Sequence, residues 1–67
     1  MTTDNKYLNR LRQQYKVVKN QNAPTKKLQE FRVRDYHAMR LFCLDTGLVS
    51  FNEIEAMEFE IDESLSS

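Results

Sequence analysis

The stretch GLVSFNE, which begins at Gly47, constrains the fold of this chain more than any other, because it ends one helix and begins the next. Glycine readily takes the left-handed conformation that terminates helices. Ser50 followed three residues later by Glu53 is the pattern of a capping box. Val49 before the cap and Ile54 after it fit a hydrophobic staple. We therefore expect a tight corner between two helices here.

The same corner shares features with the second half of a calcium-binding EF-hand loop, which has glycine at its sixth position and glutamate at its twelfth. Aligning Gly47 and Glu53 with these positions places Phe42 and Leu44 at the first and third ligand positions. Neither side chain offers an oxygen, and calcium needs six to eight oxygen ligands. One cysteine and one histidine are also too few for a four-ligand zinc site. We therefore expect no metal and no cofactor.

Residues 4–20 are predicted to form the first helix, with Thr3 or Asp4 capping its start. Its apolar residues recur every three or four positions, as on one side of a helix. They are Tyr7, Leu8, Leu11, Tyr15 and Val18. Pro24 interrupts the helical pattern, and Thr25 is suited to cap the helix that follows.

Residues 26–45 are predicted to form a second helix that is apolar on two sides. One side carries Leu28, Phe31, Ala38, Met39, Phe42 and Cys43. The other side carries Val33, Leu41 and Leu44. A helix that is apolar on two sides is usually sandwiched between neighbours. We therefore interpret the second side as an interface for a partner or for another copy of the chain.

An alternative interpretation gives the chain an α+β fold, with short strands at residues 30–34 and 57–62. The first segment alternates Phe31 and Val33 with arginines, and the second alternates apolar with acidic residues, which is the period of a strand. Pairing the two would place arginines opposite glutamates, and each such pair contributes ~0.2–1 kcal/mol. The sequence leaves helix and strand open for the first segment.

The fold class that we expect is all-α, with three short helices at about 4–20, 26–45 and 51–60. One glycine and one proline are too few for the turns of an all-β fold. Acidic residues near the end of the third helix oppose its dipole, so we expect that helix to fray. We accordingly predict a single domain over residues 1–61 and a disordered acidic tail over residues 62–67.

Charge is divided unevenly along the chain, although ten basic and ten acidic residues give a net charge of zero. Residues 1–40 contain all ten basic residues and three acidic ones, a net charge of +7, whereas residues 41–67 carry seven acidic residues, a net charge of −7. This division favours association with a charged partner or between copies. A nucleic-acid surface is the alternative use of the basic half. It would consist of Arg10, Arg12, Lys26, Lys27, Arg32, Arg34 and Arg40.

Catalytic chemistry has little support in the sequence. His37 and Cys43 are six residues apart, about 600° along a helix, so their side chains diverge. A Cys–His nucleophilic pair needs hydrogen-bond reach. A single glycine also leaves no phosphate-binding loop. We therefore expect no enzymatic activity.

Protein binding is the function that these features favour. No apolar run approaches the ~20 residues that cross a bilayer, and the first residues lack the apolar core of a signal peptide, so we expect a cytoplasmic protein. We predict a small regulatory adaptor or inhibitor that binds a protein, in keeping with a component of a nucleic-acid machine, and that also forms a homodimer. The partner-binding residues that we predict are Val33, Tyr36, Leu41 and Leu44. A small DNA- or RNA-binding transcriptional regulator is the alternative.

Overall fold

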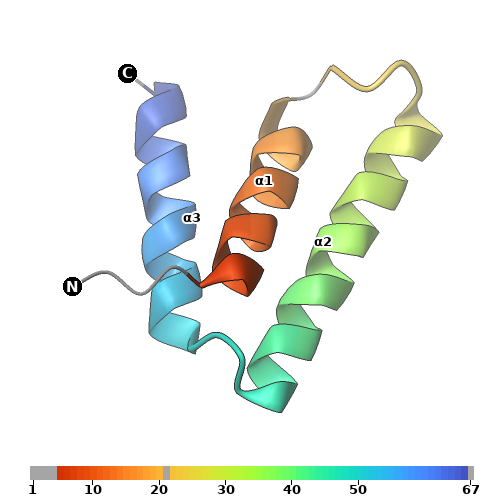
Figure 1. Ribbon diagram of the computed structural model, residues 1–67. Helices are drawn as coiled ribbons and strands as arrows, with labels where there is room; N and C mark the ends of the chain where they lie inside the picture. Colours follow the sequence, from red (N-terminus) through yellow and green to blue (C-terminus); the bar gives the residue numbers. More distant parts are fainter. Residues whose placement is uncertain (1–4, 21, 67) are drawn as a thin grey trace.

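Three helices make up the fold, which is taken from a computed structural model that describes residues 5–20 and 22–66. Helix α1 spans Lys6–Asn20, α2 spans Lys26–Thr46 and α3 spans Phe51–Ser66 (Figure 1). The all-α class and the three helices predicted from the sequence are confirmed.

The helices alternate in direction, so α1 and α3 run parallel to each other and antiparallel to α2 (Figure 1). α1 packs against both other helices. The Cα atoms extend over 39 × 29 × 15 Å. Side chains extend beyond these Cα positions, and three helices are too few to surround any one of them. Each helix therefore keeps exposed residues on one side.

Asn5 begins α1 and also ties it to the corner between α2 and α3. Its Oδ1 accepts hydrogen bonds from the backbone N–H groups of Tyr7 at 3.0 Å and Leu8 at 3.3 Å. Its Nδ2 donates to the carbonyl oxygen of Leu48 at 3.0 Å. Asn5 therefore acts as an N-cap. Thr3 and Asp4, the caps predicted from the sequence, lie outside the described residues.

Both ends of α2 have the capping interactions that the sequence predicts. The Thr25 Oγ1 accepts from the backbone N–H of Leu28 at 3.1 Å. At the other end, Gly47 has φ 75°, in the left-handed region. The backbone N–H of Leu48 donates to the carbonyl of Cys43 at 3.0 Å, the bond typical of a Schellman motif.

The start of α3 has a reciprocal capping box. The Ser50 N–H donates to Glu53 Oε1 at 3.0 Å, and the Glu53 N–H donates to Ser50 Oγ at 3.2 Å. Val49 and Ile54 on either side of the cap are both buried. These contacts fix the angle at which the chain turns from α2 into α3.

A single apolar core joins the three helices. Its buried members are Leu11, Tyr15, Tyr36, Cys43, Val49, Ile54, Met57 and Ile61. The core therefore draws two residues from α1, two from α2, three from α3 and one from the corner.

The strands of the α+β alternative are wrong for the described residues, since 30–34 lie within α2 and 57–62 lie within α3. Phe59 is 65% exposed whereas Ile61 is 7% exposed. A strand would place both on one face, but a helix turns them away from each other. The caps at both ends of α2 explain why its alternating segment is helical.

α3 runs six residues beyond its predicted end near residue 60, through most of the expected tail. Ile61 continues the buried stripe of Ile54 and Met57. The Ser66 Oγ donates back to the carbonyl oxygen of Asp62 at 3.1 Å. Packing and hydrogen bonds thus outweigh the unfavourable interaction of the acidic residues with the helix dipole.

Candidate protein-binding face of α2

α2 buries one side and exposes the other. Tyr36 and Cys43 are buried, at 6% and 0% exposure. On the opposite side, Phe31 and Leu41 are each 63% exposed and Phe42 is 51% exposed. The sequence-based grouping of Phe31 and Phe42 with Cys43 on one side of the helix is therefore wrong. Since Tyr36 and Cys43 set the buried direction, both phenylalanines turn outward.

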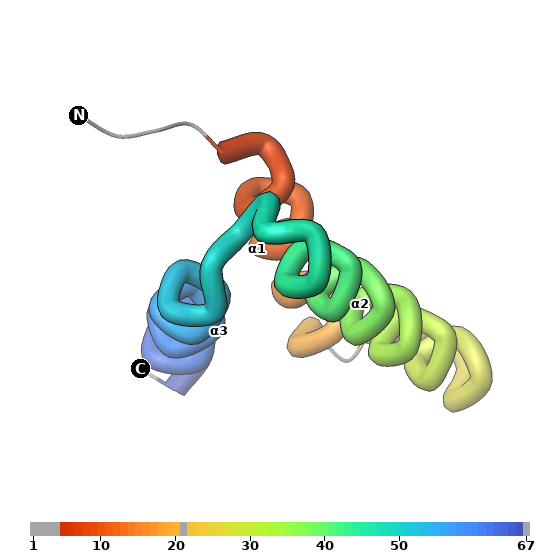
Figure 2. The backbone as a smooth tube through the Cα atoms, turned by 90° about the horizontal axis from the view of Figure 1, so that it is seen from below, coloured from red at the N-terminus to blue at the C-terminus, as the bar shows by residue number. Residues whose placement is uncertain are grey.

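Six exposed residues lie in line along this outward side, at alternating spacings of four and three. They are Lys27, Phe31, Arg34, Ala38, Leu41 and Asp45, and we call them the outer face of α2. Alternating spacings of four and three keep residues on one stripe of a helix. Figure 2 shows α2 at one edge of the molecule, with α1 and α3 on its other side. The outer face is therefore open to a partner.

The outer face carries Lys27 and Asp45 at its ends, and Arg34 and Ala38 lie between the apolar Phe31 and Leu41. Ala38, Leu41 and Asp45, with the flanking Phe42, line a shallow depression. The small side chain of Ala38 makes room for it. Within the described part of the chain, neither Lys27 nor Asp45 takes part in an ion pair. The face thus has unused charges beside unused apolar surface.

Tyr36, which the sequence suggested as a partner-binding residue, instead fastens α2 to α3. Its hydroxyl donates to Glu58 Oε2 at 2.5 Å, and Arg40 Nε donates to the same oxygen at 3.1 Å. Burial, and then the hydrogen bond to Glu58, raise the pKa of Tyr36 well above its usual range. The Arg40 guanidinium also lies 5.6 Å from the ring centroid of Phe51. This buried position leaves Tyr36 with a structural role.

The other three predicted partner-binding residues do not share one surface. Val33 is 46% exposed and lines a groove on α2 with His37 that borders the outer face at Arg34 and Ala38. Leu44 is partly buried and packs against the core. Of the four predicted residues, Leu41 alone lies on the outer face.

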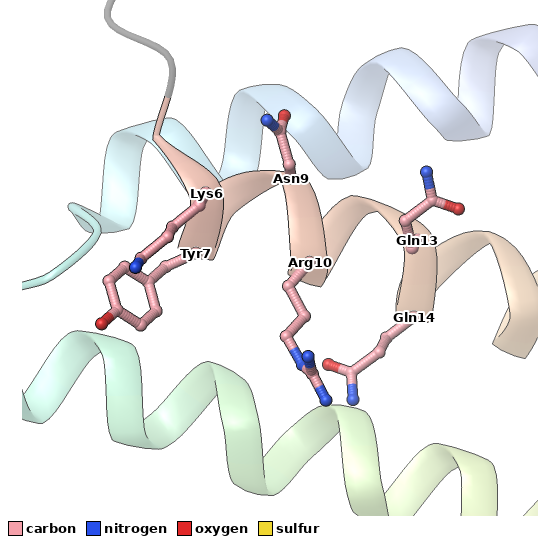
Figure 3. A pocket seen from close by; sticks show the side chains of 6 residues that line it. All are labelled: Lys6, Tyr7, Asn9, Arg10, Gln13 and Gln14. Carbon is pink, nitrogen blue, oxygen red and sulfur yellow. The ribbon is translucent and has the colours of Figure 1, made fainter.

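The arginines of α1 occupy different surroundings. Figure 3 shows Arg10 and Gln14 pointing from α1 towards α2, in a pocket that Lys6 and Tyr7 also line. Arg12 lies elsewhere on α1, where its Nη1 donates to Asn9 Oδ1 at 2.7 Å.

The basic residues of α2 are similarly dispersed. Arg32 lines a depression between α1 and α2 with Asp35. Lys26 lines the groove of Val33. Lys27 and Arg34 lie on the outer face, whereas Arg40 is engaged by Glu58. Lys26 and Arg34 line the same groove, whereas Arg10, Arg12, Arg32 and Arg40 have other surroundings.

Cys43 and His37, the two residues considered as a nucleophilic pair, lie in different surroundings. Cys43 is fully buried, and burial raises the pKa of its thiol, so the thiol stays protonated at neutral pH. His37 is exposed in the groove of Val33. Among residues 5–20 and 22–66, no group of three or more His, Cys, Asp or Glu side chains is placed to hold a metal ion. None of the helices is long and apolar enough to cross a membrane, over the same residues.

Sequence reasoning missed the outer face because it grouped Phe31 and Ala38 with Cys43 on one side of the helix and proposed the other side as the interface. A signal was nevertheless present, since Lys27, Arg34 and Asp45 fall on the same stripe. Charged residues are almost never fully buried unless paired, so their presence on the stripe indicates an exposed side.

The function of the outer face has to be inferred from its own residues. No protein-family model matches this chain, and no curated protein or solved structure is significantly similar to it.

Proposed function

We propose that this protein is a small cytoplasmic regulator, an adaptor or inhibitor, that acts by binding another protein through the outer face of α2. The observation that carries the proposal is the exposure of Phe31 and Leu41, each 63%, on the side of α2 opposite the buried Tyr36 and Cys43. Leu41 lies beside Ala38 and Phe42 in one apolar patch, and contiguous exposed apolar side chains mark interaction sites in small proteins. Aromatic residues are enriched at such interfaces.

The shape and charge of the outer face suit a helical partner. A straight row of side chains at spacings of four and three packs best against a second helix. Burial of a phenylalanine or leucine contributes about 1.5–3 kcal/mol. Lys27 and Asp45 at opposite ends of the row would set the direction and register of that helix. The outer face therefore combines an apolar anchor with an orienting charge pattern.

Site-specific photo-crosslinking in the native host tests this proposal. A benzophenone amino acid replaces Leu41 in one variant and Phe59 in a matched control, because Phe59 is 65% exposed but lies on α3. We expect adducts from position 41 that excess unmodified protein suppresses and that a Phe31→Glu competitor does not suppress. Equal adducts from both positions, or none from position 41, would contradict the proposal.

Nucleic acid serves as the contrasting ligand. Because the basic residues lie on several surfaces, we expect no measurable binding to duplex DNA or single-stranded RNA even at low salt. Binding that falls steeply with added salt and is lost on Arg10→Ala would favour the nucleic-acid regulator instead.

A further inference from the structure

We infer that the partner of the outer face is a second copy of this chain, bound with the two α2 helices antiparallel. This inference rests on the proposed function and names the partner of the same face. The six residues are spaced by four, three, four, three and four positions. This series of spacings is the same in both directions along the helix. An antiparallel second copy therefore presents its six residues at the same spacings as the first copy.

The two-fold pairing matches each residue with a complementary one. Lys27 lies opposite Asp45 of the partner subunit, and Phe31 lies opposite Leu41 of the partner subunit. Arg34 lies opposite Ala38 of the partner subunit. The symmetry repeats each pair, as in the self-complementary interface of a two-fold dimer. Opposite charges therefore meet at the two ends, apolar residues meet between them, and Arg34 meets the smallest side chain of the row.

Charge selects the antiparallel direction. A parallel pair would place Lys27 opposite Lys27 of the partner subunit, and likewise Asp45 opposite Asp45 of the partner subunit. Like charges across a helix pair disfavour that arrangement, whereas opposite charges set orientation and register. The antiparallel pair converts both ends of the row into attractive contacts.

The shallow depression on the outer face fits the guanidinium that the pairing brings to it. Its lining is Ala38, Leu41, Phe42 and Asp45. In the antiparallel pair, Arg34 of the partner subunit enters beside Ala38. An arginine there can lie against the Phe42 ring, one turn from Ala38. The hollow left by Ala38 is thus explained by the pairing.

The dimer should be weak. Each subunit contributes one helix, so the buried area lies at the low end for specific interfaces, and we expect a Kd on the order of tens of micromolar. A weak dimer of this kind exchanges readily, which suits a regulator whose face also has to meet other proteins.

Charge-swap variants examined by sedimentation equilibrium test the pairing. The full chain is measured as wild type, as Lys27→Asp, as Asp45→Lys and as the double swap, across the micromolar to millimolar range. We expect wild type to move from 8.0 kDa towards twice that mass. Each single swap should raise the dimer Kd about tenfold, because both copies of the contact between positions 27 and 45 become repulsive. The double swap should restore the wild-type Kd. Circular dichroism confirms that each variant remains helical.

The outcomes separate this inference from the proposed function. A wild-type chain that stays at 8.0 kDa, or a double swap as weak as the single ones, overturns the self-pairing. If position 41 then crosslinks only to a different protein, protein binding through the outer face still stands. If position 41 gives no specific adduct either, both inferences fail.

Discussion

The hydroxyl of Tyr15 in α1 donates a hydrogen bond to Asp62 Oδ1 in α3 at 2.9 Å. Lys19 Nζ lies 3.6 Å from the same oxygen and 5.3 Å from the centroid of the Tyr15 ring. Burial, and then the hydrogen bond to Asp62, raise the pKa of Tyr15. This cluster holds α3 to α1 past the point where the sequence predicts that the helix ends.

Replacing Asp62 with alanine should loosen the end of α3. A net hydrogen-bond contribution of about 1 kcal/mol corresponds to about fivefold faster opening of the last turns. Amide hydrogen exchange of residues 61–66 measures this effect. Glu63→Ala is the matched control, because it removes an exposed acidic residue from the same turn. Unchanged exchange in Asp62→Ala would show that the Ile61 packing alone holds the helix.

Ser50→Ala should lower the free energy of unfolding by ~1 kcal/mol, because it removes the acceptor of the capping box. Thermal and urea unfolding measure the loss. Glu55→Ala, an exposed glutamate in the same helix, should change stability much less. Similar effects from both variants would argue against a stabilising role for the cap.

The loss of stability on substituting Gly47 should depend on the backbone conformation that the new residue must adopt, rather than on the space available for its side chain. No heavy atom beyond its neighbours lies within 4 Å of a Cβ placed there, but φ is +75°. Asparagine tolerates this conformation, whereas a β-branched residue is strained in it. We expect Gly47→Val to destabilise by about 1–2 kcal/mol and Gly47→Asn by less. Denaturant melts that rank Asn as the worse substitution would contradict this explanation.

Stability should fall as the pH rises above 10. In the unfolded chain the Tyr36 phenol loses its proton near its ordinary pKa of 10.0, but the raised pKa keeps it protonated in the folded protein. The folded state then binds more protons, so its stability is full below pH 10 and declines above it, by up to ~1.4 kcal/mol per pH unit. Tyr36→Phe should reduce this slope in urea melts between pH 9 and pH 11 while lowering stability at neutral pH. An unchanged slope would exclude Tyr36 as its source.

Leu41 and Leu44, which sequence reasoning placed on one surface, should respond differently to glutamate. Leu41 is exposed, so Leu41→Glu should change the stability of the monomer by no more than about 0.5 kcal/mol. Leu44 packs against the core, so Leu44→Glu should destabilise by about 2 kcal/mol or more. Unfolding measured at low micromolar concentration, where self-association is negligible, compares them. Equal losses would contradict the different burial of the two side chains.

The corner could be predicted from the sequence because its stabilising contacts are local. Gly47, Ser50 and Glu53 lie within seven consecutive residues, and glycine followed by this serine and glutamate spacing is typical of a helix end and a capping box. The end of α3 could not be predicted in this way. Asp62 stabilises it through Tyr15, a residue 47 positions away, and no local pattern reveals that contact.

The outer face was only partly predictable for a related reason. Helical periodicity showed that residues 26–45 carry apolar side chains on more than one side, but it grouped Phe31 with Cys43 and did not say which residues meet the core. The contacts of Tyr36 with Glu58 on another helix decide the orientation of α2. A short helix with two apolar stripes therefore needs its tertiary partners before its exposed side can be named.

The parallel course of α1 and α3 has a consequence for the order of folding. The corner between α2 and α3 is held by contacts between residues about ten positions apart or fewer. Closing so short a loop costs little conformational entropy. Contact between Tyr15 and Asp62 instead closes 47 residues of chain. α1 and α2 are also joined by a short connection, residues 21–25, and they pack against each other more extensively than α1 and α3 do. We expect the α1–α2 hairpin to form early and the docking of α3 to limit the folding rate. During synthesis, α1 and α2 can therefore pair before the last helix has been made.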